Sequence, residues 1–373
     1  MSTSRKILVV SGIYPPDIGG PATYVPQICE QLVRDGYTVS VVSLEDETTN
    51  GRVNEPWKRT FISRKHNKIF RVLLTITTLL KESAGCNAVF ANGLYEEVGV
   101  LKLFRPKIHF IAKIVGDPIW ERNRNRSKIS VQIEEFNKRP LNFRNLIERR
   151  ILTWSLNRFD LVTCPSSQLK ELIGCWNVKK EIYVIHNGIR CKEVAAHTIK
   201  YDVVSVTRLV PWKNLDKVII ACAKTGMRLA LCGEGPEMAN LKKIAETSGA
   251  DVKFLGQLDS KKTADVIDES NIFTLLSDYE GLSFALLEAM MAGKRILVSE
   301  CRGNTDVISN DYTGKIVDPY DERAVQSALK ELSENSASTQ ALEKNAHDTA
   351  KMNYCAEKQI GKMINLIVEN YEK

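Results

Sequence analysis

The sequence predicts an α/β protein with two doubly wound parallel-sheet domains, both Rossmann-like, that face each other across a cleft. Its length of 373 residues corresponds to two or three domains of ordinary size. Short and almost continuously apolar strands alternate with helix-length segments, a pattern typical of parallel sheets covered on both faces. The same alternation starts again near residue 202, so we expect two such domains in succession.

The predicted first domain covers residues 1–190, the second covers 191–355, and 356–373 is expected to form a helix that crosses back to the first domain. The first domain is expected to hold an amphipathic helix from about 22 to 34 and strands at 6–12, 38–44, 87–93, 108–116, 161–166 and 181–188. The second is expected to hold strands at 202–208, 228–235, 252–258, 272–277, 295–300 and 314–318. Ligands of such sheets bind beyond the carboxyl ends of the strands, so the cleft is the expected site.

The cysteines and the apolar segments indicate a cytoplasmic protein. Nine cysteines without a Cys-x-x-Cys pair fit reduced thiols better than a disulfide framework or a zinc site. The first apolar run is about six residues long, shorter than the core of a secretory signal. The longest nearly apolar stretch, 72–80, is far shorter than the roughly 20 residues that span a bilayer. We therefore expect no secretory signal and no membrane-spanning segment.

Positive charge is concentrated in the first half of the chain. Residues up to Arg190 include 29 Lys and Arg against 18 Asp and Glu, a net charge of +11, and the remainder has 23 against 27, a net charge of −4. Nucleic acid is not the expected partner because no recognition module accompanies these cations. An anionic membrane surface or a phosphorylated substrate fits better, which predicts a protein that is peripheral on the inner face of the cell membrane.

Residues 277–293, SDYEGLSFALLEAMMAG, combine a strand end with an almost wholly apolar helix. Glu288 is the one carboxylate of that helix, and it either pairs with a basic side chain or accepts hydrogen bonds from ligand hydroxyls. Glu280 precedes the helix amino terminus, where the N–H groups near 282–285 attract phosphate. This stretch therefore predicts neighbouring binding sites for a sugar and a phosphate.

Glu280 and Glu288, separated by seven residues and followed by Ala289 and Gly293, resemble the E-x7-E signature of family-four retaining glycosyltransferases with the GT-B fold. The segment VTRLVPWKNLD (206–216) is similar to the G-R-x-x-x-x-K segment of that family. Other similar segments, in the family's order, are IYPPDIGGPATYV (13–25), CGEGPE (232–237) and VKFLGQL (252–258).

The resemblance implies that Arg208 and Lys213 bind the diphosphate of a nucleotide-sugar donor in the place of a metal ion, so no metal and no other cofactor is expected. Glu280 would hydrogen-bond the donor sugar, and Glu288 would hydrogen-bond the ribose. The resemblance also implies a set of donor-binding residues with small side chains, backbone contacts or a place at the helix amino terminus: Gly19, Gly20, Gly233, Leu255, Gly256, Leu282, Ser283 and Phe284.

The sequence departs from the family pattern at three places near this site. Thr207 stands where the family usually has glycine, and Asn214 follows Lys213 where glycine is common. Gly116 and Asp117 follow the strand at 108–116, where many members carry a histidine near the reacting sugar. Asp117 is therefore a candidate catalytic residue, and capping of the following turn is the alternative.

Two basic stretches in the first domain are candidates for acceptor and membrane binding. The stretch 120–150 is arginine-rich and loop-like, and Arg122, Arg124 and Arg126 could bind the pyrophosphate of a lipid-linked acceptor or form a solvated face. In 52–80, basic residues flank apolar ones, which suits either an interfacial helix or an ordinary domain helix.

The resemblance implies a retaining, metal-independent glycosyltransferase that moves a hexose-type sugar from a nucleotide diphosphate sugar to a glycan acceptor, expected to be lipid-linked. Biosynthesis of bacterial surface polysaccharide, such as lipopolysaccharide, is the expected pathway. A nucleotide-sugar 2-epimerase with the same fold and a non-catalytic nucleotide- or membrane-binding protein are the alternatives.

Overall fold

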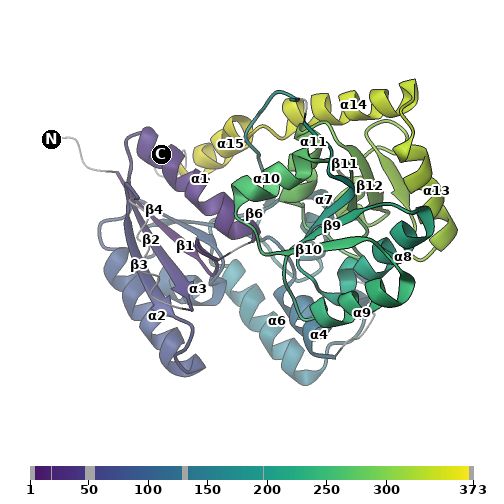
Figure 1. The fold of residues 1–373 in the computed structure, drawn as a ribbon. Coiled ribbons are helices and arrows are strands. Elements are labelled where there is room, and N and C mark those ends of the chain that lie inside the picture. Colours follow the sequence, from purple (N-terminus) through teal and green to yellow (C-terminus); the bar gives the residue numbers. More distant parts are fainter. Residues whose placement is uncertain (1–4, 18, 47–54, 128–132, 196, 369–373) are drawn as a thin grey trace. The chain divides into compact units, whose positions relative to one another are not determined.

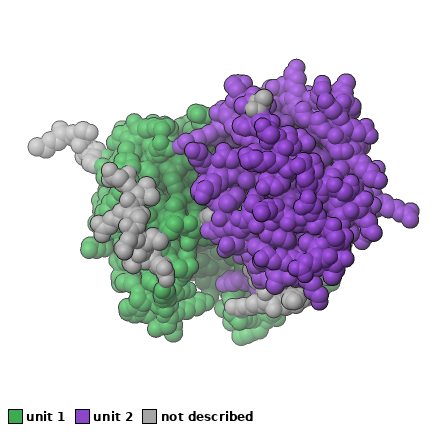
Figure 2. Space-filling view, in the orientation of Figure 1, with its two compact units in different colours: residues 1–119, 137–188, 357–373 green, residues 120–136, 189–356 purple. Residues whose placement is uncertain are grey.

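The computed structural model of the chain describes residues 5–17, 19–46, 55–127, 133–195 and 197–368. The chain divides into two compact units, shown in two colours in Figure 2. Unit 1 comprises residues 1–119, 137–188 and 357–373, and unit 2 comprises 120–136 and 189–356. Residues 120–136 thus belong to unit 2, whereas their place in the sequence had assigned them to the first domain.

Within the described residues, unit 1 contains a parallel sheet of seven strands in the order β3-β2-β1-β4-β5-β6-β7. Every predicted strand of this unit is present, although each differs by a few residues at its ends. The strands are β1 (Lys6–Ser11), β2 (Thr38–Glu45), β3 (Lys58–Ser63), β4 (Ala88–Asn92), β5 (His109–Lys113), β6 (Leu161–Cys164) and β7 (Ile182–Val184). The chain order reverses between β1 and β4, which makes this pair the topological switch point of the sheet.

The helices of unit 1 correct two expectations. The basic stretch 52–80 contains an edge strand, β3, as well as a helix. The stretch 120–150 is mainly helical where it is described, with residues 139–142 between two of its helices. Helix α3 packs against both α2 and α6 (Figure 1). The helices are α1 (Gly20–Arg34), α2 (Lys68–Glu82), α3 (Tyr95–Phe104), α5 (Ile133–Lys138, which begins in unit 2), α6 (Phe143–Leu156), α7 (Ser167–Gly174) and α15 (Ala356–Val368).

Over the described part of unit 2, six parallel strands form a sheet in the order β10-β9-β8-β11-β12-β13. The strands are β8 (Tyr201–Val206), β9 (Leu229–Cys232), β10 (Val252–Gly256), β11 (Ser270–Leu275), β12 (Arg295–Ser299) and β13 (Lys315–Val317). Here the order reverses between β8 and β11, so the switch point lies between these two neighbouring strands.

Helices cover both faces of the second sheet (Figure 1). Successive strand residues point to opposite faces, so Val203 joins the apolar core under one helix layer and Val204 joins the core under the other. The helices are α4 (Pro118–Ser127), α8 (Leu215–Thr225), α9 (Met238–Ser248), α10 (Ser260–Asp268), α11 (Phe284–Met291), α12 (Arg302–Thr305), α13 (Glu322–Ser333) and α14 (Ala337–Asn353), and a short 3₁₀ turn spans Pro211–Lys213. The sheet of unit 2 therefore packs against an apolar core on each face, and the loops after its strands can position a site.

Cys191 and Cys355 form a disulfide with a Cα–Cα separation of 5.7 Å. This pair corrects the expectation that the thiols are all reduced. It was not predictable from the spacing because 164 residues separate the two cysteines. A parallel bridge between Ile189 and Cys355 brings the two segments together. Among the described residues, no helix combines the length and the apolar composition needed to span a membrane.

Candidate functional site

The candidate donor site of unit 2 is built on the loops that follow β8 and β11. These strands pair in parallel, so both loops leave the same edge of the sheet at its switch point. The first loop carries Arg208 and Lys213, and the second carries Ser277 and Glu280. The topology therefore brings together residues that lie about 70 positions apart in the chain.

The ammonium group of Lys213 and the carboxylate of Glu280 form a direct, largely buried ion pair. The Ser277 hydroxyl donates a hydrogen bond of 2.6 Å to Oε1 of Glu280, the same oxygen that binds Lys213. Asn214 adopts the left-handed conformation with φ of 50°, ends the 3₁₀ turn and begins α8. Asparagine tolerates that conformation better than most residues, so the loop keeps its shape without the glycine that the family usually has.

Glycines bring the neighbouring loops close to this pair. A Cβ atom at Gly303 would lie 1.9 Å from the backbone oxygen of Glu280, and one at Gly233 would lie 1.9 Å from the backbone oxygen of Thr207. Gly233 also donates its N–H to the backbone oxygen of Gly256 at 2.7 Å. Only glycine fits the approaches at Gly233 and Gly303, and Gly256 has a positive φ of 64°, so these three glycines fix the shape of the loops around Arg208 and Glu280.

Two charged side chains of the site have no hydrogen-bond or ion-pair partner among the residues that the structure describes. The Arg208 side chain is exposed and makes no hydrogen bond or ion pair with any residue that the structure describes. The carboxylate of Glu288 likewise makes none within the described ranges, although it is partly buried. Burial raises its pKa to about 7, and the nearby Lys192 only partly offsets this rise. A basic side chain that pairs with Glu288, which was one of the two interpretations from the sequence, is not found within the described part of the chain.

The amino terminus of α11 lies next to Glu280. Ser283 caps this helix, since its hydroxyl accepts a hydrogen bond from the N–H of Leu286. Leu282 is buried and packs into the core of unit 2, with Phe284 and Leu255 partly buried against the same core. The side chains of these three residues are therefore structural, which leaves their backbone groups for a donor.

In unit 1, Gly19 and Gly20 lie at the start of α1, which has no side-chain cap. Gly19 has a φ of 153°, and a Cβ there would meet only the side chain of Ile13, at 3.9 Å. The glycine pair therefore places no side chain beside the first turn of α1, in which Pro21 has no N–H to donate. This loop follows β1 at the switch point of the first sheet.

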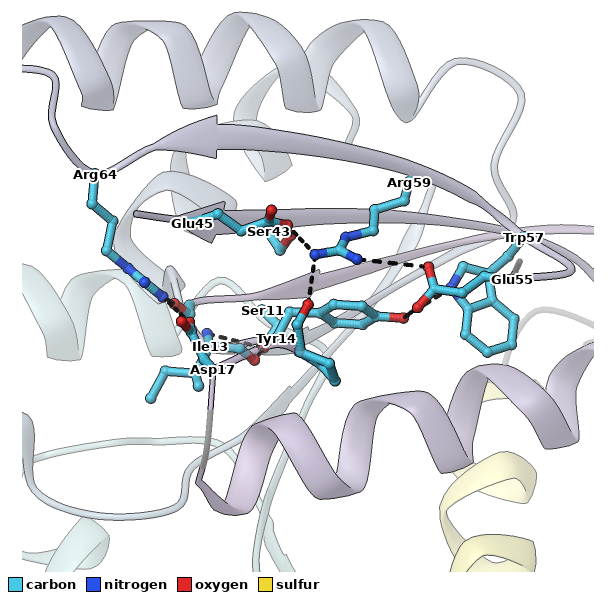
Figure 3. Close-up of polar contacts among 12 residues, drawn as sticks. Ser11, Ile13, Tyr14, Asp17, Ser43, Glu45, Glu55, Trp57, Arg59 and Arg64 are labelled. Carbon is cyan, nitrogen blue, oxygen red and sulfur yellow. Dashed lines mark hydrogen bonds and ion pairs between the residues drawn. The ribbon is translucent and has the colours of Figure 1, made fainter. Parts of the chain in front are cut away.

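Two arginines near β3 hold this loop in place (Figure 3). Arg59 pairs with Glu45 and donates to the backbone oxygen of Pro15 at 2.6 Å. Arg64 donates to the backbone oxygen of Gly12 at 2.8 Å and pairs with Asp17. Strand β3 was not predicted. Its residue Arg59, together with Arg64 just beyond its end, binds the loop that leads to the glycine pair.

Asp117, which was predicted to be a candidate catalytic residue, makes hydrogen bonds within unit 1 that give it a structural role. Asp117 is fully buried in unit 1, where Oδ1 accepts a hydrogen bond from the N–H of Ile119 at 3.0 Å. Its other oxygen, Oδ2, binds Nη2 of Arg149 at 2.6 Å. The structure thus shows the turn cap that was the alternative interpretation.

The three arginines predicted to bind an acceptor have different surroundings. Arg122 is exposed on α4, and the side chain of Arg126 lies outside the described residues. Arg124 is buried in unit 2, with Nη2 lying 2.6 Å from Oδ2 of Asp278. This ion pair gives Arg124 a structural role, and its contact with an acceptor stays a prediction.

Sequence reasoning missed the contact between α4 and the donor loops. Trp120 packs edge-on against Trp212 and Tyr279, with ring centroids 5.5 and 5.3 Å apart. Trp212 directly precedes Lys213, and Tyr279 directly precedes Glu280. A pocket of about 300 Å³, lined in part by Arg124, lies beside these contacts. The only hint in the sequence was the presence of two tryptophans in otherwise polar segments.

The two switch-point sheets and the loops with Lys213 and Glu280 define a glycosyltransferase with the GT-B fold. The chain belongs to the family-four glycosyltransferases: the family "Glycosyltransferase Family 4" matches residues 18–193, and "Glycosyl transferases group 1" matches residues 192–349. Together the two matches cover nearly the whole chain.

Similar proteins agree with this assignment. An uncharacterized glycosyltransferase of Methanocaldococcus jannaschii, MJ1069, is 23% identical over 95% of this chain and 96% of its own length. The alpha-monoglucosyldiacylglycerol synthase of Streptococcus pneumoniae is 21% identical over 87% of this chain and 78% of its own. The structure of Anabaena Alr3699/HepE in complex with UDP and glucose has a TM-score of 0.79 and 16% identity, covering 98% of this chain and 100% of that one.

Proposed function

We propose that this glycosyltransferase is a retaining, metal-independent enzyme that transfers a hexose from a nucleoside diphosphate sugar to a glycan acceptor carried on a lipid. The observation that carries the proposal is the contact between Lys213 and Glu280. Arg208, in the same loop as Lys213, and Glu288, on α11, have no partner among the described residues. A cation beside a hydroxyl-binding carboxylate is what a sugar diphosphate requires.

Lys213 and Arg208 are proposed to stabilise the leaving group. During transfer, the bond between the anomeric carbon and the diphosphate oxygen breaks, and its electron pair stays on the diphosphate. The acceptor hydroxyl oxygen forms the new bond to that carbon and gives up its proton, which the departing diphosphate oxygen accepts. Fixed cations near the diphosphate bind its growing negative charge more tightly in the transition state than in the ground state, which accelerates the reaction.

Glu280 is proposed to orient the donor sugar and Glu288 the ribose. Ser277 and Lys213 hold one oxygen of Glu280 in place, so the carboxylate is oriented before a sugar arrives. Glu288 is partly buried without a hydrogen-bond partner among the described residues, and a pair of ribose hydroxyls would satisfy it. The glycine pair Gly19 and Gly20 is proposed to contact phosphate through backbone N–H groups.

The proposal of a lipid-linked acceptor rests on the excess positive charge of residues 1–190. The relative from Streptococcus pneumoniae is named for a glycolipid product, which is compatible with a lipid acceptor here. Arg122 is the exposed candidate for an acceptor phosphate. Synthesis of bacterial surface polysaccharide at the inner face of the cell membrane is the proposed setting.

The test is turnover by the purified protein with UDP-, GDP-, ADP- and dTDP-hexoses, with and without a membrane extract as a source of lipid-linked acceptor. Acceptor-dependent release of nucleoside diphosphate, with the sugar incorporated in the α-configuration of the donor, supports the proposal. Conversion of the donor into an epimer without any acceptor would identify a 2-epimerase instead. Nucleotide binding without turnover of any donor would identify a non-catalytic protein.

A further inference from the structure

Helix α6 has its polar residues inside and its largest apolar residues outside. Its buried residues are Asn145, Arg149, Leu152, Ser155 and Leu156, so three of the five are polar. The exposed apolar residues are Phe143, Ile147, Ile151 and Trp154, which are 80%, 40%, 48% and 39% exposed. Their spacing of four, four and three residues aligns them along one side of the helix, as expected for a 3.6-residue period.

Polar contacts inside unit 1 fix this orientation of the helix. Arg149 pairs with the fully buried Asp117 and lies over the ring of Trp176, 4.2 Å from its centroid. The Thr153 hydroxyl donates to the backbone oxygen of Trp176 at 2.7 Å. A Cβ atom at Gly99 of α3 would lie 2.7 Å from Cβ of Ser155, so the two helices approach closely there. Turning the apolar side inward would break these contacts, so the outward stripe is built into the fold.

Cations surround the apolar stripe of α6. Arg144 and Arg150 are exposed on the same helix, and Arg150 has no hydrogen bond or ion pair within the described residues. Arg158 follows the helix and stacks on Trp154 at 3.5 Å from the ring centroid. Glu148 is the one acidic residue of α6, and Arg144 pairs with it at 3.2 Å. The surface therefore presents apolar side chains with an excess of positive charge.

We propose that the outer face of α6 docks unit 1 on an anionic lipid bilayer. Apolar side chains flanked by cations suit a helix that lies in the interface plane, where acyl chains receive Phe143, Ile147 and Ile151 and lipid phosphates receive the arginines. Trp154 has the amphipathic ring that such interfaces favour. Helix α3 packs on α6 (Figure 1). It ends in Leu103 and Phe104, and both of these side chains are exposed as well.

A second copy of the chain fits this face less well. A two-fold contact through α6 would bring the cations of one copy against those of the other, and like charges in an apolar contact oppose association. The inference rests on the proposed lipid-linked acceptor, and it names a surface different from the basic stretch 52–80. In that stretch, Lys58 pairs with Glu82 and Arg64 with Asp17, so those two cations are already bound within unit 1.

The experiment compares vesicle cosedimentation of the full chain and of the double variant Ile147→Ser/Ile151→Ser. Wild type is expected to bind phosphatidylcholine vesicles that contain phosphatidylglycerol, less so at high salt. The double variant is expected to bind at least about tenfold more weakly, because two apolar side chains no longer enter the bilayer. The matched control is Tyr312→Ser/Met352→Ser, which removes exposed apolar surface from unit 2 and is expected to bind like wild type. Brominated lipids are expected to quench wild-type tryptophan fluorescence, and Trp154→Phe is expected to lose that quenching.

Three results would overturn the inference. The first is that the wild-type protein does not bind the anionic vesicles. The second is that the double variant binds them as tightly as the wild-type protein does. The third is that the wild-type protein is a dimer and the double variant a monomer, with no change in vesicle binding. Donor binding in solution separates this inference from the proposed function. A double variant that binds nucleotide sugar normally shows an intact fold, whereas wild type that binds no nucleotide sugar contradicts the proposed function whatever the vesicles show.

Discussion

Arg124 on α4 and Asp278 in the loop after β11 form a buried ion pair, with Nη2 and Oδ2 2.6 Å apart. The two residues are 154 positions apart in the chain. The other oxygen of Asp278 accepts hydrogen bonds from Asn214 at 2.7 Å and from Tyr320 at 2.9 Å. The backbone N–H of Asp278 donates a hydrogen bond to the backbone oxygen of Trp212. One carboxylate thus connects α4 with both loops that carry the donor-site residues.

We predict that Arg124→Met and Asp278→Asn each lower the free energy of unfolding by about 3–5 kcal/mol, because each leaves a buried charge without its partner. The double variant is expected to be more stable than either single variant, since no unpaired charge remains. Chemical denaturation followed by circular dichroism measures this. Arg122→Met, an exposed change on the same helix, is the control and is expected to have little effect. Additive losses in the double variant would show that the pair contributes little by itself.

The sequence predicted the parts of this site that depend on local pattern. Apolar runs located strands such as β8 and β11, and the apolar run after Glu280 located helix α11. It could not predict the pair Arg124–Asp278, because an isolated arginine in a polar stretch looks like a solvated charge until its distant partner is known. Strand β3 escaped for a similar reason: KRTFIS carries basic residues whose carboxylate partners, among them Glu45 and Glu82, lie elsewhere in the chain.

The orientation of α6 was equally beyond the sequence. A helical period shows which residues share a side, but it does not show which side faces the core. Here the usual assumption that apolar residues point inward gives the opposite answer. The buried pair of Arg149 with Asp117 decides the orientation, and only the fold reveals that pair.

Lys213→Ala and Arg208→Ala are each expected to lower turnover by about 100-fold or more, because each removes charge that is proposed to stabilise the departing diphosphate. Arg208→Ala is expected to leave the melting temperature nearly unchanged, whereas Lys213→Ala is expected to lower it, because it leaves the largely buried carboxylate of Glu280 without its cation. Lys217→Ala, on α8 but four residues beyond Lys213, is the matched control. Steady-state kinetics with the preferred donor give the measurement. A variant that keeps turnover within a few-fold of wild type would remove that residue from the site.

Turnover is expected to continue in the presence of EDTA. Two cationic side chains, Lys213 and Arg208, are proposed to supply the charge that a divalent ion supplies in other glycosyltransferases. The measurement is the initial rate after dialysis against chelator, with manganese or magnesium added back in a parallel sample. Loss of activity that either ion restores would contradict the proposed leaving-group chemistry.

Because of Glu288, a rise in pH should strengthen nucleotide binding and lower the free energy of unfolding. Burial raises the pKa of its carboxyl from 4.5 to about 7. The folded protein therefore holds this proton more tightly than the unfolded chain does, so its contribution to the free energy of unfolding falls as the pH rises from 4.5 to 7. Two ribose hydroxyls, by contrast, need the ionised carboxylate as acceptor, so affinity for the nucleoside diphosphate should increase as the pH rises through 7.

Glu288→Gln is expected to remove both pH dependences and to weaken nucleotide binding at pH 8, where wild-type Glu288 is ionised, by about tenfold, the loss of one hydrogen bond to a charged group. Glu280→Gln is expected to lower turnover more than nucleotide binding, because Glu280 is proposed to contact the sugar and not the ribose. Calorimetric titration with the preferred nucleoside diphosphate between pH 5.5 and 8.5 measures the affinities, and thermal unfolding over the same range measures stability. Glu246→Gln, an exposed change on α9, is the control. If the Glu288 variant binds nucleotide as tightly as wild type at high pH, the carboxylate does not hold the ribose and its burial needs another explanation.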